Sequence, residues 1–179
     1  MSVPLTPAME RFVLHWGEMG ARWGVNRTVA QIHALLYLSE TPLDAEQIQE
    51  TLSVARSNVS TSLRELQNWG IVRVVHVMGD RRDRFESIKD VWELFRIILD
   101  ERKRREFDPT IQVLRDCLGE LKEGDGADDH ARPQIQAMLE FFESVSSLYD
   151  QMQKLPAQSA IKLARLGPKI RKLLEIRGR

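Results

Sequence analysis

The sequence holds one cysteine, Cys117, in 179 residues, which excludes an internal disulfide and a cysteine-based zinc cluster. It has no apolar run long enough to span a membrane, and its start lacks the basic and apolar segments of a secretion signal. Lys and Arg together number 26, as do Asp and Glu, so whole-chain charge argues neither for nor against nucleic acid. These absences favour a cytoplasmic protein without membrane contact.

Motifs for catalysis and for metal binding are also missing. The chain has four histidines, and none lies in an HxxxH pair suited to a metal ion. The acidic segment DGADDH lacks the spacing and the terminal Glu of a calcium loop, so we expect a solvated turn there. There is no nucleophile elbow, phosphate-binding loop or dinucleotide fingerprint. We therefore predict no enzyme activity, no bound metal and no cofactor.

Charge is concentrated in separate segments of the chain. Residues 56–84 carry six basic and three acidic side chains, whereas residues 116–150 carry nine acidic and two basic ones. Residues 161–179 carry seven basic side chains and one acidic one. This local asymmetry is more informative than the neutral total. The basic C-terminal segment is expected to be solvated or to pair with the acidic segment.

Residues 1–89 contain the pattern of several short helices followed by a β-hairpin. After Gly70 the hydrophobic period changes to two, and the turn residues of MGDRRD separate the strand-like segments IVRVVHV and RFES. This order predicts a winged helix-turn-helix with a basic wing. The residues expected to cap the successive helices are Thr6, Asn26, Asp44 and Ser53.

The fourth helix of this series has an unusually thin polar face. Val59, Leu63 and Leu66 form its apolar side, while short polar residues stand opposite, where a solvated helix usually carries Glu and Lys. Short side chains let a helix backbone enter the major groove, and wing arginines can hold phosphates or enter the minor groove. A polar helix facing water is the alternative, and the basic wing favours DNA. The predicted DNA contacts are Arg56, Ser57, Asn58, Ser60, Thr61, Arg64, Arg81, Arg82 and Arg84.

The segment PLDAEQIQETLSVARSNVSTSLRELQNWGIV, followed by GDRRDRFE, resembles the MarR-type winged-helix regulators. The resemblance is greatest to the GbsR-like branch, which includes repressors of glycine betaine synthesis, and it covers about residues 10–90. It implies a homodimeric DNA-binding repressor that dimerises through terminal helices, in some members with a small effector. Residues 25–28, VNRT, lack the glycine expected before the arginine, so the resemblance does not define the start of that helix.

Residues 90–179 are expected to form a helical dimerisation region. One helix is predicted to start at Asp90 and a second at Asp108. Apolar residues recur at alternating spacings of three and four over 111–121 and 135–152, which is typical of the seam of a coiled coil or helical bundle. A last basic helix is expected after this seam, beyond Pro156. The predicted fold is therefore mostly α with a small β-hairpin wing, divided into a DNA-binding domain and a dimerisation region.

Aromatic residues outside the fourth helix suggest an effector site. Phe12, Trp16 and Trp23 recur at helical spacing, and aromatic faces attract quaternary ammonium groups of the choline type, to which the GbsR-like resemblance points. The alternative is that these rings fill the core and the dimer interface. The predicted effector-binding residues are Phe12, Trp16, Trp23, Trp92 and Tyr149.

These patterns together predict a sequence-specific, double-stranded DNA-binding transcription regulator. We expect a homodimeric repressor, controlled by a small molecule such as a quaternary ammonium compound. The rival hypothesis is a winged-helix scaffold for protein–protein interaction that does not read DNA. The basic wing distinguishes the two, because a scaffold has no need of it.

Overall fold

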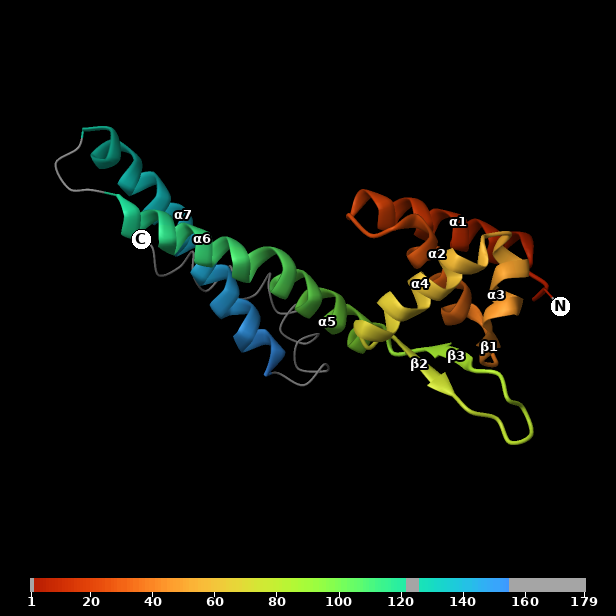
Figure 1. Ribbon diagram of the computed structural model, residues 1–179. Coiled ribbons are helices and arrows are strands. Elements are labelled where there is room, and N and C mark those ends of the chain that lie inside the picture. The colour runs from red at the N-terminus through yellow and green to blue at the C-terminus, as the bar shows by residue number, and fades with distance from the viewer. Residues whose placement is uncertain (1, 122–125, 155–179) are drawn as a thin grey trace, which may run out of the picture. The chain divides into compact units, whose positions relative to one another are not determined.

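The computed structural model describes residues 2–121 and 126–154, which belong to two compact units divided between Ile97 and Ile98 (Figure 1). The sequence places the division eight residues earlier, between residues 89 and 90. The last basic helix predicted after Pro156 lies outside the described residues.

Four helices open the first unit: α1 (Pro7–Arg22), α2 (Arg27–Leu38), α3 (Ala45–Leu52) and α4 (Arg56–Asn68). Three of the predicted caps are confirmed. The side chain of Thr6 accepts a hydrogen bond from the Met9 amide at 3.3 Å, and that of Asn26 accepts one from Thr28 at 2.8 Å. Asp44 forms a reciprocal capping box with residue three of its helix. Local side-chain chemistry therefore determines where these helices begin.

The prediction that Ser53 caps α4 is wrong. Ser53 instead ends α3 in the left-handed conformation, with φ of 53°, and its own amide donates to the carbonyl of Gln49. This conformation turns the chain between the two helices, and α4 begins only at Arg56, after Ala55. The Ser53 hydroxyl therefore does not precede the first turn of α4, and this turn has no side-chain cap.

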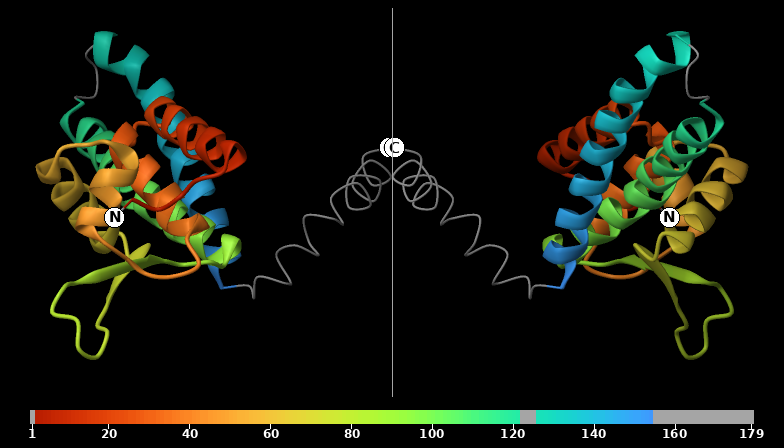
Figure 2. Two further views of the ribbon diagram at one scale, coloured as in Figure 1. Left: turned by 90° about the vertical axis from the view of Figure 1, so that its right-hand side faces the viewer. Right: turned by 90° about the vertical axis from the view of Figure 1, so that its left-hand side faces the viewer.

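Helix α2 is the centre of the first core. Ile32, Leu35 and Leu36 are almost completely buried, and α1 and α4 pack against their helix (Figure 2). Gly17 and Gly20 lie within α1 rather than ending it, and a Cβ at Gly20 would lie 2.5 Å from the Cβ of Ala30. The glycines therefore permit a close approach of α1 to α2, which a larger residue would prevent.

The sheet has three short antiparallel strands in the order β1 (Leu43–Asp44), β3 (Arg84–Ser87), β2 (Val72–Val75). The predicted hairpin is confirmed, with Val74 opposite Phe85, and in both views of Figure 2 its loop extends beyond the helices of the first unit. Leu43 also pairs with Phe85, through the strand that the sequence did not predict. Two residues are too few to show an alternating pattern.

The second unit contains the end of α5 (Val91–Arg102), a π-helical segment η1 (Lys103–Phe107), α6 (Asp108–Glu120) and α7 (Gly126–Gln153). The helix predicted to start at Asp108 is confirmed, because α6 begins at this residue. The chain is also helical through η1 before it, and this wider turn precedes Pro109, which has no amide hydrogen to donate. The prediction for the acidic segment is wrong. The end of DGADDH is the first turn of α7 and not a loop, since acidic residues there suit the helix dipole.

Helices α6 and α7 lie side by side and form the second core (Figure 1). Ile111 and Leu139 are buried, and the rings of Phe107 and Phe142 are 5.3 Å apart. The predicted seam therefore packs partly within one chain. Two of its apolar positions, Met138 and Met152, are exposed to solvent, as is Phe141 on the same helix.

His33 is a buried polar residue of the first core. Its Nδ1 accepts a hydrogen bond from the indole nitrogen of Trp16 at 3.2 Å, so the neutral ring must carry its proton on Nε2. This second nitrogen has no hydrogen-bond partner among the residues that the structure describes. Burial, together with the nearby charge of Lys89, lowers the pKa of His33 from 6.5 to about 4.

The low pKa of His33 predicts a loss of stability in mild acid. The unfolded chain binds the proton near pH 6.5, before the folded chain does, so stability is complete above that pH and falls as pH approaches 4. We expect the unfolding free energy to fall by about 2 kcal/mol between pH 7.5 and pH 5. Urea titrations of wild type and His33→Gln, which keeps an acceptor for Trp16, measure this loss. It should disappear in His33→Gln and persist in the exposed control His15→Gln.

Candidate nucleic-acid interface

Helix α4 presents six of the predicted DNA contacts to solvent. Val59, Leu63 and Leu66 are buried against the core, which turns the opposite side of the helix outward. Gln67 is exposed as well, although it was not among the contacts predicted from the sequence. Gln67 lies three residues after Arg64 in the sequence, and this spacing could have placed it on the same side of the helix. The exposed predicted residues are Arg56, Ser57, Asn58, Ser60, Thr61 and Arg64.

The outer face of α4 is shallow and rich in hydrogen-bonding groups. Ser57, Asn58 and Thr61 offer hydroxyl and amide groups close to the helix backbone, and Arg64 supplies one long cationic side chain. Because α4 has no side-chain cap, its first-turn amides have no side-chain acceptor at this end of the helix. Such a face can approach a flat or grooved polyanion closely and donate hydrogen bonds to it.

Helix α3 supports α4 from behind and is itself firmly anchored. Ile48 is fully buried in the core, and α3 packs against α4. At the start of α3, the carboxylate of Asp44 accepts from the Gln47 amide at 2.8 Å, while the Gln47 side chain accepts from the Asp44 amide at 3.0 Å. Asp44 is 3% exposed, so its charge lies almost completely inside the protein.

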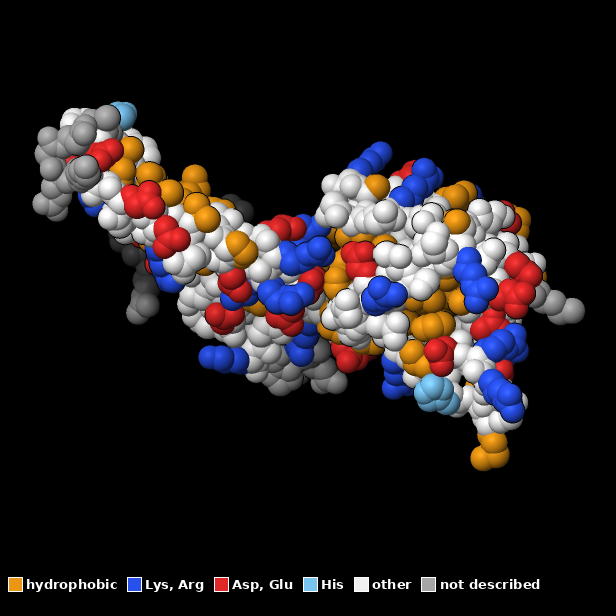
Figure 3. Space-filling view, viewed as in Figure 1, with side chains coloured by type: hydrophobic (Ala, Val, Ile, Leu, Met, Phe, Trp, Pro, Cys, Tyr) orange, Lys and Arg blue, Asp and Glu red, His pale blue; other side chains and the backbone are white. Residues whose placement is uncertain are grey.

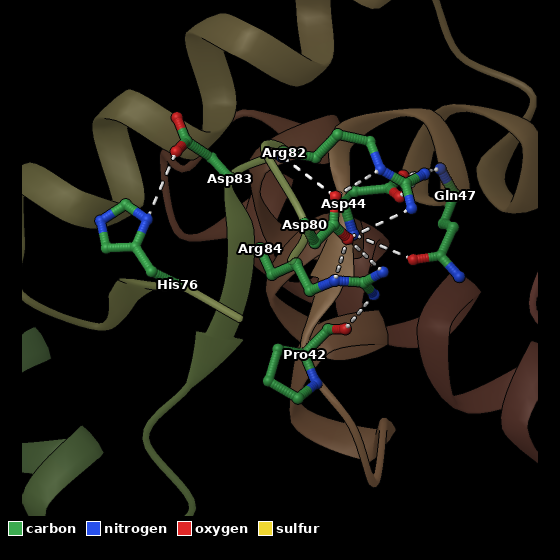
Figure 4. A network of polar contacts seen from close by, with 8 residues as sticks. All are labelled: Pro42, Asp44, Gln47, His76, Asp80, Arg82, Asp83 and Arg84. Atoms are coloured by element: carbon green, nitrogen blue, oxygen red, sulfur yellow. Dashed lines mark hydrogen bonds and ion pairs between the residues drawn. The ribbon is translucent and has the colours of Figure 1, made fainter. Parts of the chain in front are cut away.

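Two of the three predicted wing arginines bind carboxylates of the protein (Figure 4). Arg82 Nη1 lies 2.6 Å from Asp44 Oδ2, and Arg82 Nε donates to Asp80 at 3.1 Å. Arg84 Nη2 donates to the other oxygen of Asp80 at 2.8 Å. Hydrogen bonds from Arg82, and then from Arg84, hold the pKa of Asp80 well below its usual value. The network therefore stays charged at neutral pH and fastens the wing to the start of α3.

The arginines of the wing thus differ in what they can contact. Arg81 is exposed, and Arg82 is bound to carboxylates but keeps 57% of its side chain accessible. Arg84 is 22% exposed at the side chain and also donates to the carbonyl of Pro42 at 3.3 Å. The DNA contacts of these residues stay predictions, and the structure gives Arg82 and Arg84 a further role in holding the wing.

Another basic residue of the wing was missed. Arg73, on β2, has an 80% exposed side chain and pairs with Glu86 across the hairpin at 2.5 Å. The alternation of IVRVVHV places it on the outer face, so the period of two could have identified it. It is a further exposed cation on the hairpin that carries Arg81, and it is paired with Glu86.

The predicted effector residues are not all brought together. Phe12 and Trp16 stack with ring centroids 5.4 Å apart, and the Trp16 ring also contacts the His33 ring, with centroids 6.2 Å apart. Trp23 is the exposed C-cap residue of α1. Two further rings belong elsewhere: Trp92 contacts Phe95, and Tyr149 in the second unit donates to Asp100. A pocket shared by all five residues stays a prediction.

The described residues offer no group of metal ligands and no membrane-spanning helix. Within residues 2–121 and 126–154 no three His, Cys, Asp or Glu side chains are grouped as metal ligands. No helix in these ranges combines the length and the apolar character needed to cross a membrane. The candidate interface is built from hydrogen-bonding groups and cations.

The dual role of Asp44 predicts a marked loss of stability when it is replaced. Asp44→Ala removes the cap of α3 and the buried partner of the Arg82 ion pair, so the unfolding free energy should fall by about 2 kcal/mol. Asp83→Ala is the matched control, because Asp83 is exposed and its ion pair within the described part of the chain is a long one, with His76 at 3.9 Å. Its effect should stay within about 0.5 kcal/mol in the same urea titration. Equal stability of the two variants would contradict the anchoring role of Asp44.

Comparison with known proteins agrees with this arrangement. The model of the MarR family matches residues 23–83. The HTH-type transcriptional repressor GbsR of Bacillus subtilis (strain 168) is 19% identical over 136 residues, which is 74% of this chain and 75% of the relative. The putative HTH-type transcriptional regulator YvaV of the same organism is 24% identical over 95 residues, 51% of this chain and 54% of that protein.

A solved structure shares the fold. A crystal structure described as that of a transcriptional regulator is 20% identical, has a TM-score of 0.53, and covers 81% of this chain and 99% of its own. The helix order and the hairpin of the first unit match the winged helix-turn-helix pattern. The first unit therefore has the winged helix-turn-helix arrangement, and residues 23–83 within it are similar to the MarR family.

Proposed function

We propose that the protein is a sequence-specific, double-stranded DNA-binding transcription regulator that acts as a homodimer. The observation that carries this proposal is the exposed face of α4, where short polar side chains and Arg64 stand opposite a buried apolar face. This helix follows α3 after a tight connection and is itself followed by a basic hairpin. In this arrangement α4 takes the place of the recognition helix in the major groove.

The chemistry of the face divides into two tasks. Arg64 is long enough to place two donors on the O6 and N7 acceptors of a guanine, a contact that distinguishes bases. Ser57, Ser60 and Arg56 lie near the start of the helix, where hydroxyl, guanidinium and amide donors suit phosphate oxygens. Phosphate contacts would fix the position of the helix, and Arg64 with Asn58 and Thr61 would read the sequence.

The relatives' names support control of transcription as the outcome of binding. GbsR is named a transcriptional repressor and YvaV a putative transcriptional regulator. Repression is therefore the proposed mode of action. The small-molecule control expected from the sequence stays a prediction, because the aromatic residues proposed for it lie in separate groups of rings.

A homodimer is supported by the outer face of α7. Phe142 of the predicted seam contacts Phe107 of its own chain, so it has an internal partner. Four large apolar side chains of the same helix are instead exposed, and spacings of three, seven and four place them on one side. Such a stripe is suited to the matching stripe of a second copy. The exposed residues are Met138, Phe141, Leu148 and Met152.

The rival function, a scaffold for protein–protein contacts, uses the same fold without DNA. It does not account for the polar face of α4 or for the exposed cations of the wing, Arg73 and Arg81. DNA selection distinguishes the hypotheses directly. A scaffold would enrich no sequence from a pool of random duplexes.

Replacing Arg64 tests base reading. A binding sequence is first selected from random duplexes with the wild-type chain, and affinities are then measured by fluorescence anisotropy. Arg64→Ala should weaken binding to the selected sequence by roughly 1–3 kcal/mol and leave binding to random DNA nearly unchanged. Arg81→Ala should weaken binding to both the selected and the random DNA. It should also reduce the slope of log affinity against log salt concentration by the amount that corresponds to about one phosphate contact. Arg11→Ala, exposed on α1, is the control. Equal losses on both DNAs for Arg64→Ala would remove its reading role.

Charges placed on the apolar stripe of α7 test dimerisation. The double variant Phe141→Glu, Leu148→Glu should sediment as a monomer at micromolar concentration, because dimerisation would bury both charges without partners. Its circular dichroism should stay native, since both side chains are exposed in one chain. Ser147→Glu, on the opposite side of the helix, should remain a dimer. A wild-type monomer in the same experiment would refute the homodimer.

A further inference from the structure

The end of the wing is a tight turn with an apolar residue at its apex. The Asp80 amide donates to the carbonyl of Val77 at 3.0 Å, and Gly79 has φ of +84°. A positive φ at the third residue of a hydrogen-bonded turn is the arrangement of a type II turn, which here requires glycine. Met78 is the second residue of this turn and therefore lies at its outermost point.

Met78 is fully exposed, and the neighbouring Val77 is 43% exposed. A single exposed apolar side chain is common in proteins and alone indicates nothing. This one, however, is fixed in place. Asp80 closes the turn with its amide and, through its carboxylate, binds Arg82 and Arg84 at the base of the loop. The protein thus holds a methionine out into solvent with a buttressed turn.

The surroundings of Met78 are basic. Figure 3 shows an apolar side chain at the very end of the hairpin, with Lys or Arg side chains just behind it. Arg81 is exposed three residues away, and Arg73 is exposed on β2 of the same hairpin. Of the two acidic residues of this loop, Asp80 is occupied by two arginines, and Asp83 is exposed. An apolar point within a cationic rim is complementary to a polyanion with an accessible apolar interior.

We propose that Met78 enters the DNA minor groove beside the site read by α4, and acts as a specificity-determining residue through groove shape. This proposal rests on the proposed function. The minor groove is about 6 Å wide and 7.5 Å deep, and its walls and floor of sugars and base edges offer apolar contact. A methionine side chain is unbranched and slender, and apolar side chains of this kind act as wedges at base steps in other minor-groove proteins.

The reach of the wing is sufficient for this contact. β2 ends at Val75 and the turn begins at Val77, so Met78 lies three residues beyond the strand, a distance of at most roughly 10 Å. Arg81 and Arg73 can then meet the phosphates on either side of the groove. Since the minor groove distinguishes mainly A·T from G·C pairs and differs in width, Met78 would favour flanks by their width and deformability.

The test changes the minor groove alone. Starting from the sequence selected by wild type, A·T pairs in the flanks are replaced by 2,6-diaminopurine·T, which adds a minor-groove amino group and preserves the major-groove pattern. When the modified pair stands at the flank position that Met78 contacts, the wild-type protein should bind the modified duplex about fivefold more weakly than the unmodified one. Met78→Ser should bind the unmodified site about fivefold more weakly and show no dependence on the added amino group. Met78→Leu should retain the dependence, and Leu14→Ser, an exposed apolar control on α1, should behave as wild type.

The possible outcomes separate the two proposals. If Met78→Ser keeps both the affinity and the flank dependence of wild type, the apex stays outside the groove and this inference is overturned. A uniform loss of affinity with the flank dependence intact would also overturn it, because Met78 would then make no groove-specific contact. If the wild-type chain enriches no sequence at all, the proposed function fails first, and the role of Met78 fails with it.

Discussion

The carboxylate of Asp44 joins the two parts of the first unit for which DNA contacts are predicted, the helix pair and the wing. One side of it caps α3, the helix behind the exposed face of α4, and the other side holds Arg82 of the wing at 2.6 Å. A buried carboxylate is costly unless it is paired and hydrogen-bonded, and here it is both. The position of the wing is therefore coupled energetically to the start of the helix pair, and a change in either would cost part of this network.

This coupling explains why the wing contains acidic residues among its arginines. Asp80 is a poor neighbour for a phosphate, yet its two oxygens hold Arg82 and Arg84, and its amide closes the turn that carries Met78. The hairpin loop would otherwise be a long, mobile connection, and ordering it at the moment of binding would cost conformational entropy. A preformed wing avoids that cost, because its side chains are oriented before any partner arrives.

The sequence predicted much of the first unit because the relevant signals are local. Caps at Thr6, Asn26 and Asp44, together with the change of period after Gly70, depend on residues two or three positions apart. Ser53 was misjudged because a left-handed residue between two helices leaves no periodic signal. The pairing of Arg82 with Asp44 also escaped prediction, since it joins residues far apart in the chain. In the second unit, the π-helical turn before Pro109 is a local change of the backbone hydrogen-bond pattern. The spacing of hydrophobic residues does not predict such a change.

The distribution of charge bears on how DNA would be recognised. Of the three arginines predicted for the wing, two are already paired with carboxylates, so the wing would release fewer counterions than its composition suggests. The face of α4 adds only Arg56 and Arg64 as cations, and its other exposed groups are short and neutral. A surface of this kind gains little from unspecific attraction, in keeping with the neutral total charge of the chain. Discrimination would then depend mainly on hydrogen bonds and on shape, both of which require the helix and the wing to be held in fixed positions by the core beneath them.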